Sequence, residues 1–161
     1  MLLVGVLSDT HLYRAEPWLC QTVARVFAGA PVILHAGDLT EAAVLDAFAG
    51  KTVHAVCGNM CSLACRSGLP LLRVVELAGF RIGLAHGAGL GPDLERELAR
   101  LFPDDLDCIV YGHTHQAVCH RRDGILFLNP GTFRAGGRGS YGLLGLGETI
   151  TGEIHPLERA P

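Results

Sequence analysis

The sequence predicts an α/β fold in its front half and an α+β arrangement in its back half, on two observations. Apolar runs at residues 2–7, 32–34 and 51–56 alternate with segments of helical periodicity, which is typical of parallel strands buried on both faces. The later apolar runs are short, numerous and separated by turn residues, which favours antiparallel pairing. Together these observations predict a four-layer αββα sandwich, with two mixed β-sheets flanked by helices, in one domain over residues 1–161.

The front half contains two helical patterns. Pro17 is expected to open the first helix, because the N–H that proline lacks would be unpaired there anyway. The apolar face of this helix is expected to comprise Leu19, Val23, Val26 and Phe27. Thr40 with Glu41 is expected to start a second helix. Its apolar stripe is expected to include Val44, Leu45 and Phe48.

The back half begins with residues 60–70, which have no clear period and are expected to form a loop. A hairpin is expected at residues 71–77 and 80–85, followed by a helix over residues 92–102. The remaining strands are expected at residues 108–111, 118–121, 125–128, 141–146 and 150–155.

Composition restricts the classes of function. The 161 residues carry a formal net charge of −3 and no block of Lys or Arg, so there is no strong nucleic-acid signal and no basic face for a membrane. No apolar run is long enough to span a bilayer. Residues 1–7 lack a basic leader and a cleavage site, so we expect a core strand there and not a signal peptide. Without export, the six cysteines are expected to be reduced thiols in a cytoplasmic protein.

Residues able to bind a metal follow the apolar runs, each near a predicted strand end. They are Asp9, His11, Asp38, Asn59, His86, His113 and His115. Because the carboxyl ends of parallel strands lie along one edge, we expect these side chains to converge there. If residues 112–115 stay extended, His113 and His115 also share one face. Seven ligands exceed the need of one ion and fit two.

These motifs together resemble a known family. Asp9-x-His11, Gly37-Asp38, Gly58-Asn59, His86-Gly87 and Gly112-His113-Thr114-His115 occur in this order. In that order they resemble the calcineurin-like metallophosphoesterases. The short chain and a late Asn129-Pro130-Gly131-Thr132 resemble the small bacterial and archaeal phosphodiesterase branch, which also contains the retromer scaffold subunit of eukaryotes.

The resemblance implies roles for the seven residues. Asp9, His11, Asp38 and His115 would hold one divalent metal. Asp38, Asn59, His86 and His113 would hold a second, with Asp38 bridging the two. Imidazole and carboxylate ligands suit Mn²⁺, which we expect first, or Ni²⁺, Zn²⁺, Fe or Co²⁺.

The implied chemistry is hydrolysis of a small or nucleotide-like phosphate ester. Two carboxylates against two divalent ions leave roughly two net positive charges, which attract a phosphate anion. The ions also lower the pKa of a bound water, so that hydroxide can attack phosphorus near neutral pH. Asp38, Asn59 and His86 are the expected catalytic residues.

The sequence departs from the family at two positions that often hold a histidine. Met60 follows Gly58-Asn59, and Ala88 follows His86-Gly87, so both usual donors of a proton to the leaving group are missing. Such a donor is worth a factor of roughly 10²–10⁴. A phosphomonoester with a poor leaving group would suffer most, and this favours an activated phosphodiester. A water or a residue from 60–66 could replace the donor.

A scaffold function on the same fold is the alternative, as in the retromer subunit. A scaffold can lose metal ligands without harm, whereas all seven positions here hold competent ligands. Exposed strand edges would permit a homodimer or higher homo-oligomer. We interpret His35 as structural. Cys57, Cys61 and Cys65 match no zinc template. A redox role remains open for Cys61 and Cys65.

Overall fold

The computed structural model describes residues 1–158 and contains two five-stranded mixed sheets. The strand order in the first sheet is β10 (Ile150–Pro156), β9 (Ser140–Leu146), β1 (Leu2–Leu7), β2 (Val32–His35) and β3 (Thr52–Ala55). The order in the second is β4 (Leu72–Leu77), β5 (Phe80–Ala85), β6 (Cys108–Val110), β8 (Ile125–Asn129) and β7 (Val118–Arg122). The helices are α1 (Pro17–Val26), the 3-10 helix η1 (Ala42–Phe48), α2 (Leu63–Gly68) and α3 (Leu94–Leu101).

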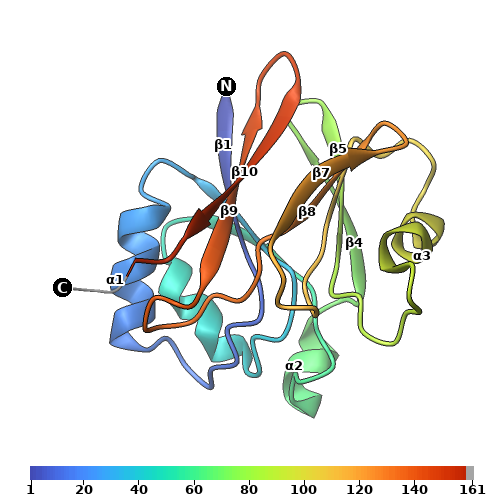
Figure 1. Cartoon of the computed structure of the whole chain (residues 1–161). Coiled ribbons are helices and arrows are strands. Elements are labelled where there is room, and N and C mark those ends of the chain that lie inside the picture. The colour runs from blue at the N-terminus through green and yellow to red at the C-terminus, as the bar shows by residue number, and fades with distance from the viewer. Residues whose placement is uncertain (159–161) are drawn as a thin grey trace.

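The two sheets face each other, with α1 on the outside of one and α3 on the outside of the other (Figure 1). Apolar side chains from both sheets form the central core, among them Val6, Leu34, Leu84 and Val110. A second cluster packs α1 and η1 against the first sheet, and a third packs α3 against the second sheet. The predicted four-layer αββα sandwich is therefore confirmed.

Strand β1 is buried on both faces because its side chains alternate between two of these clusters. Val4 and Val6 belong to the central core, whereas Leu7 packs with α1. A Cβ on Gly5 would meet the rings and methyl groups of Phe27 and Ile33. Strand β1 is therefore packed between the central core on one face and α1 on the other.

Parallel pairing brings the strand ends together at one edge. In the first sheet Leu7 pairs with His35, and His35 with Ala55, so β1, β2 and β3 end side by side. In the second sheet Leu84 pairs with Val110, so β5 and β6 also end together. The loops that leave these strands start from a common edge, as the sequence predicted.

Two local predictions are wrong. Residues 42–48 form a 3-10 helix and not an α-helix. Glu41 is its N-cap residue, as expected, but no side chain caps it, because the Glu41 carboxylate accepts from Ser62 and Thr40 bridges to Leu12. The predicted loop at residues 60–70 contains α2. The Ser62 hydroxyl caps that helix by accepting the Cys65 N–H at 3.1 Å, but six residues are too few to show an apolar period.

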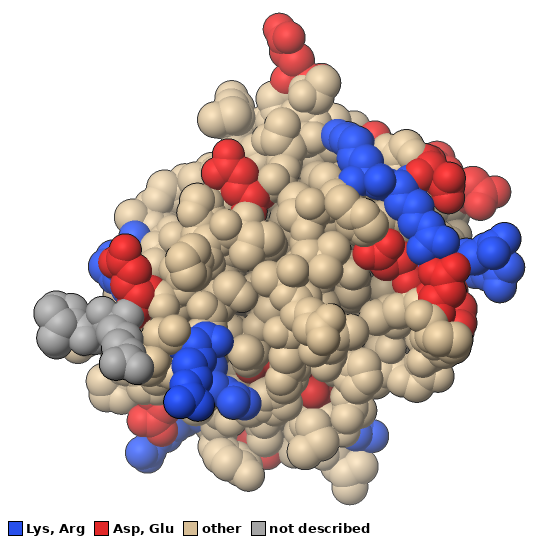
Figure 2. Space-filling model, in the orientation of Figure 1, with Lys and Arg blue, Asp and Glu red and all other residues tan. Residues whose placement is uncertain are grey.

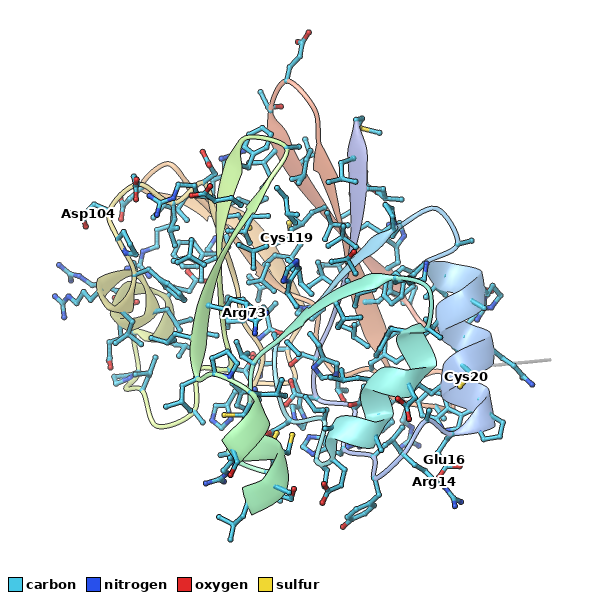
Figure 3. The ribbon with its side chains drawn as sticks, turned by 180° about the vertical axis from the view of Figure 1, so that it is seen from behind. Arg14, Glu16, Cys20, Arg73, Asp104 and Cys119 are labelled. Carbon is cyan, nitrogen blue, oxygen red and sulfur yellow. The ribbon has the colours of Figure 1, made fainter. Side chains whose placement is uncertain are left out.

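The charged side chains on the surface make individual contacts and do not form a basic band. Arg73 of β4 lies 3.4 Å from His54 Nδ1 of β3 and so links the edge strands of the two sheets (Figure 3). Burial, and next the Arg73 charge, lower the pKa of His54.

On the face drawn in Figure 2, Lys and Arg lie in separate small groups and most of the surface is uncharged. None of the helices in residues 1–158 has the length and apolar content of a membrane span.

Candidate metal centre

Five loops carry the predicted ligands to one place. Among residues 1–158, two groups of potential metal-binding side chains form, and Asp9 belongs to both. One group is Asp9, His11 and His115; the other is Asp9, Asp38 and His86. Within each group the ligand atoms all lie within 4.8 Å of one another. Asn59 and His113 adjoin the second group.

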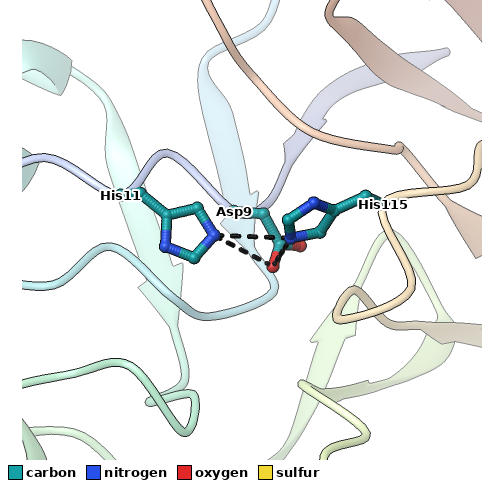
Figure 4. A group of neighbouring side chains, drawn as sticks. All are labelled: Asp9, His11 and His115. Carbon is teal, nitrogen blue, oxygen red and sulfur yellow. Dashed lines mark hydrogen bonds and ion pairs between the residues drawn. The ribbon is translucent and has the colours of Figure 1, made fainter.

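The first group is arranged around the Asp9 carboxylate (Figure 4). His115 Nε2 lies 3.1 Å and His11 Nε2 3.7 Å from Asp9 Oδ1, and the two nitrogens are 3.4 Å apart. Ligands on a tetrahedral ion with bonds of about 2.1 Å are spaced by roughly 3.4 Å. The three atoms therefore have the spacing of ligands on one transition-metal ion.

The second group is centred on His86. Its Nε2 atom lies 3.1 Å from Asp38 Oδ2 and 3.1 Å from Asn59 Oδ1. Its Nδ1 atom lies 2.8 Å from the carbonyl oxygen of Ala36. Because that carbonyl can only accept, Nδ1 carries a proton, and in the neutral ring the lone pair of Nε2 faces the carboxylate and amide oxygens. A carbonyl that fixes the far ring nitrogen in this way is typical of a metal-binding histidine.

The surroundings shift both partners toward their charged forms. Burial alone would raise the pKa of Asp38, but its hydrogen bonds to His86 and to the Met60 N–H outweigh burial and lower it. Burial would likewise lower the pKa of His86, and its bond to Asp38, with the Asp9 charge, outweighs burial and raises it. Each of the two partners therefore favours the charged form of the other.

Residues 112–115 do not stay extended. His113 has φ 68° and His115 has φ 58°, both in the left-handed region. The two rings diverge: the ring centroid of His113 lies 5.2 Å from that of His86, whereas His115 contacts Asp9. The two histidines therefore lie in different places: His113 lies beside the second group, and His115 belongs to the first.

Left-handed backbone recurs through the site. Asp9, His11 and Asp38 have φ values of 55°, 49° and 53°. Non-glycine residues in this region carry strain of order 1–3 kcal/mol each, and such residues cluster at functional sites.

Glycines allow the loops to approach the carboxylates. A Cβ on Gly58 would collide with the Asp38 carboxylate and lie 2.6 Å from its backbone nitrogen. A Cβ on Gly112 would collide with the Ser8 hydroxyl and lie 2.7 Å from Asp9 Oδ2. Gly58 and Gly112 are therefore required by the close approach of the Asp38 and Asp9 carboxylates.

Three further residues, none of them among the predicted ligands, hold the segments that carry the ligands. The Ser8 hydroxyl donates to Asp9 Oδ2 at 2.5 Å. Asn129 donates to the Gly112 carbonyl at 2.9 Å, and the Thr132 hydroxyl donates to the Asp9 carbonyl at 2.9 Å. The signal for the last two was present in the motif Asn129-Pro130-Gly131-Thr132.

His35 also stabilises the site through hydrogen bonds to the segments that carry two of the ligands. Its Nδ1 atom accepts the Gly37 N–H at 3.2 Å, which leaves the Nε2 proton to donate to the Thr10 hydroxyl at 3.2 Å. Burial, and next the charge of His86, lower the pKa of His35 to about 3. The neutral ring therefore connects the loop that carries Asp9 with the loop that carries Asp38 through hydrogen bonds.

Neither Met60 nor Ala88, the two positions that lack a histidine, has a side chain that can donate a proton. The Met60 N–H donates to Asp38 Oδ1 at 2.8 Å, while its side chain is 58% exposed. Arg66 donates from Nε to the Cys61 carbonyl at 3.0 Å and from its terminal nitrogen to the Asn59 carbonyl. Because a guanidinium does not give up a proton in proteins, Arg66 can bind phosphate but cannot act as the acid.

The cysteines beside the site are buried, and burial raises the pKa of Cys57 and Cys65. Cys61 Sγ lies 3.3 Å from the Gly58 N–H, which donates to it. Burial, and next the neighbouring Cys61, raise the pKa of Cys65 to about 12. These thiols therefore pack the loop that carries Asn59.

Imidazole and carboxylate groups gathered where the strands of two facing sheets end define a class of metal-binding α/β sandwich. The pattern of the calcineurin-like phosphoesterase superfamily domain matches residues 2–149. The chain therefore belongs to this superfamily, and the resemblance seen in its motifs is confirmed.

Individual relatives agree with this membership. The chain is 36% identical over 134 residues to a probable metallophosphoesterase of Methanocaldococcus jannaschii, covering 81% of this chain and 68% of the relative. It is 39% identical over 67 residues to a phosphodiesterase of Escherichia coli, covering 40% of this chain and 34% of the relative. The structure of Vps29 from Entamoeba histolytica in complex with Zn²⁺ aligns with a TM-score of 0.72 at 23% identity, covering 96% of this chain and 99% of the other.

Proposed function

We propose that this protein is a two-metal-dependent phosphodiesterase that hydrolyses a small or nucleotide-like phosphate ester. The observation that carries the proposal is the convergence of carboxylate and imidazole ligands from both sheets in two groups that share Asp9. Membership of the phosphoesterase superfamily supports hydrolysis of a phosphate ester. The partial likeness to a phosphodiesterase supports a diester.

The donor set fits two divalent transition-metal ions, with Mn²⁺ first and Ni²⁺, Zn²⁺, Fe or Co²⁺ as alternatives. We assign Asp9, His11, Asp38 and His115 to one ion, and Asp38, Asn59, His86 and His113 to the other. His11 Nε2 lies 4.0 Å from Asp38 Oδ2, which supports the proposal that Asp38 would help to hold both ions. When bound, such ions would supply positive charge for the phosphoryl oxygens and would lower the pKa of a water that serves as the nucleophile.

The protein's own groups orient these components. Asp38 is held by the Met60 N–H and His86 by the Ala36 carbonyl, so neither side chain has to reorganise when substrate arrives. Asn59 and His86 adjoin the reacting atoms, and with Asp38 they are the proposed catalytic residues. Since Met60 and Ala88 cannot protonate a leaving group, the site favours diesters with good leaving groups.

The test uses the purified protein after chelation and after addition of Mn²⁺, Ni²⁺ or Zn²⁺. We expect metal-restored cleavage of bis-p-nitrophenyl phosphate, with slower cleavage of p-nitrophenyl phosphate. Asp38→Ala should reduce cleavage to the background rate. The matched control is Asp46→Ala, because Asp46 is an exposed residue of η1. Equal cleavage by the Asp38 variant and the wild type would contradict the proposal.

A metal-binding scaffold with little catalytic activity is the second candidate. The likeness to Vps29, which also appears as a 24% identical relative over 139 residues in fission yeast (Schizosaccharomyces pombe), favours it. Calorimetry separates the two functions. Two ions bound per chain without cleavage of either ester under any metal supports the scaffold.

We further propose that the protein acts in the cytoplasm and assembles as a homodimer or higher homo-oligomer. The six free cysteines suit a reducing compartment. The edge strand β4 exposes Leu72 and Val74, which supports pairing between copies. Fractionation of the native cells tests the location, and sedimentation analysis tests the assembly.

A further inference from the structure

A cavity of about 690 Å³ opens directly beside the candidate metal centre. Asn59 and His86, which lie 3.1 Å apart at their polar atoms, belong to both the centre and the cavity wall. The cavity is therefore continuous with the place where a phosphate would bind. Its size suits a small organic group.

The lining of this cavity is polar at one end and apolar elsewhere. Within the described part of the chain, the charged or hydrogen-bonding side chains that line it are Asn59, His86 and Arg66, apart from the thiol of Cys57. Arg66 donates to the Asn59 carbonyl, so these three residues are neighbours. The rest of the wall is dominated by six leucines, at positions 69, 71, 72, 90, 98 and 101.

The leucines divide into a floor and an exposed rim. Leu98 is fully buried and belongs to the core under α3. Leu71 is 72% and Leu101 48% exposed, so neither is needed to fill that core. Exposed leucines around a concave site indicate contact with an apolar ligand.

We propose that this leucine-lined cavity binds an apolar ester arm of the substrate, an alkyl or aryl group, while the phosphate lies at the end formed by Asn59, His86 and Arg66. The inference rests on the proposed phosphodiesterase function and specifies its substrate class. A sugar hydroxyl or a charged arm placed against the leucines would lose hydrogen bonds to water without replacement. The site therefore selects for apolar arms.

Binding of non-cleavable phosphonates tests this inference without measuring activity. Methylphosphonate, butylphosphonate and phenylphosphonate are titrated into the metal-loaded protein by calorimetry. Each buried methylene strengthens binding by about fourfold when it is fully withdrawn from water. Because the cavity is open to solvent, we expect butylphosphonate and phenylphosphonate to bind about tenfold more tightly than methylphosphonate.

Variants at the rim locate the effect. In the double variant Leu71→Ser/Leu101→Ser, we expect the butyl-to-methyl ratio of affinities to fall to about threefold, with methylphosphonate affinity unchanged. The matched control is Leu63→Ser, because Leu63 is 83% exposed and lies outside the cavity lining. It should keep the wild-type ratio. Circular dichroism confirms that each variant is folded.

The outcomes separate this inference from the proposed function. Equal affinity for the three phosphonates in the wild type, or loss of the ratio in Leu63→Ser as well, overturns the apolar-arm cavity even if diesters are cleaved. Failure to bind any phosphonate also overturns it. A size-dependent ratio that depends on Leu71 and Leu101 supports it, and the absence of diester cleavage would then count against the catalytic proposal alone.

Discussion

At the scale of single residues, the site depends on side chains whose buried, neutral form is maintained by their neighbours. His35 is an example, because it is fully buried and neutral, and its two ring nitrogens connect Thr10 with Gly37. Protonation would add a second donor where only the Gly37 N–H is available. The loops that carry Asp9 and Asp38 are thus tied to the neutral form of one ring.

This dependence predicts a pH effect on stability. The pKa of His35 falls from 6.5 in the unfolded chain to about 3 in the fold, so below pH 6.5 the unfolded chain binds a proton that the folded chain does not. Stability from this residue is complete above pH 6.5 and is lost as the pH falls toward 3, at about 1.4 kcal/mol per pH unit.

We compare the wild type with His35→Gln, in chelator, by urea unfolding. Between pH 6.5 and 5.0 the wild type should lose about 2 kcal/mol more of its free energy of unfolding than the variant. The variant should be less stable than the wild type at pH 7, since it loses hydrogen bonds. The difference between their free energies of unfolding should become smaller as the pH falls. Parallel curves for the two proteins would show that His35 does not titrate in this way.

At the scale of elements, the loop after β8 supports the loop after β6. The Asn129 side chain donates to the Gly112 carbonyl at 2.9 Å and to the Thr114 hydroxyl at 3.0 Å, and it is fully buried. Its oxygen accepts the Gly131 N–H at 3.0 Å. One amide therefore fixes the segment that carries both His113 and His115.

Asn129→Asp tests this support because it keeps the shape but replaces the two donor hydrogens with an acceptor. We expect metal affinity to fall by about 10–100-fold, the usual cost of losing a group that orients ligands. The measurement is calorimetric titration with Mn²⁺ or Zn²⁺. The control is Gln116→Glu, an exposed residue that makes the same amide-to-acid change on the same loop. Unchanged affinity in the Asn129 variant would remove it from the site.

The elements also show what sequence can predict. Long apolar runs such as Leu2–Leu7 fix their own strand state by burial on both faces, so the residues that follow them could be placed at one sheet edge. Helix α2 could not be predicted, because its six residues are set by the Ser62 cap and not by a pattern. The left-handed backbone of His113 and His115 depends on tertiary contacts from Asn129, to which local pattern is blind.

At the scale of the whole molecule, the centre joins the two sheets. Asp9 and Asp38 follow strands of the first sheet, whereas His86 and His115 follow strands of the second, and each contact of 3.1 Å across the centre pairs one residue from each. Asp9 and Asp38 are almost completely buried and their carboxylates lie close together. Without a cation, repulsion between them opposes the packing of the sheets.

A bound metal should therefore stabilise the entire fold. A ligand that binds only the native state adds about 2.7 kcal/mol at a hundred times its dissociation constant, and this corresponds to a rise of about 5–10 °C in Tm for a protein of this size. We expect Mn²⁺ or Zn²⁺ to raise Tm in differential scanning calorimetry and a chelator to reverse the rise. Asp38→Ala should abolish most of it and Asp46→Ala none. An equal rise in the Asp38 variant would mean that the metal binds elsewhere.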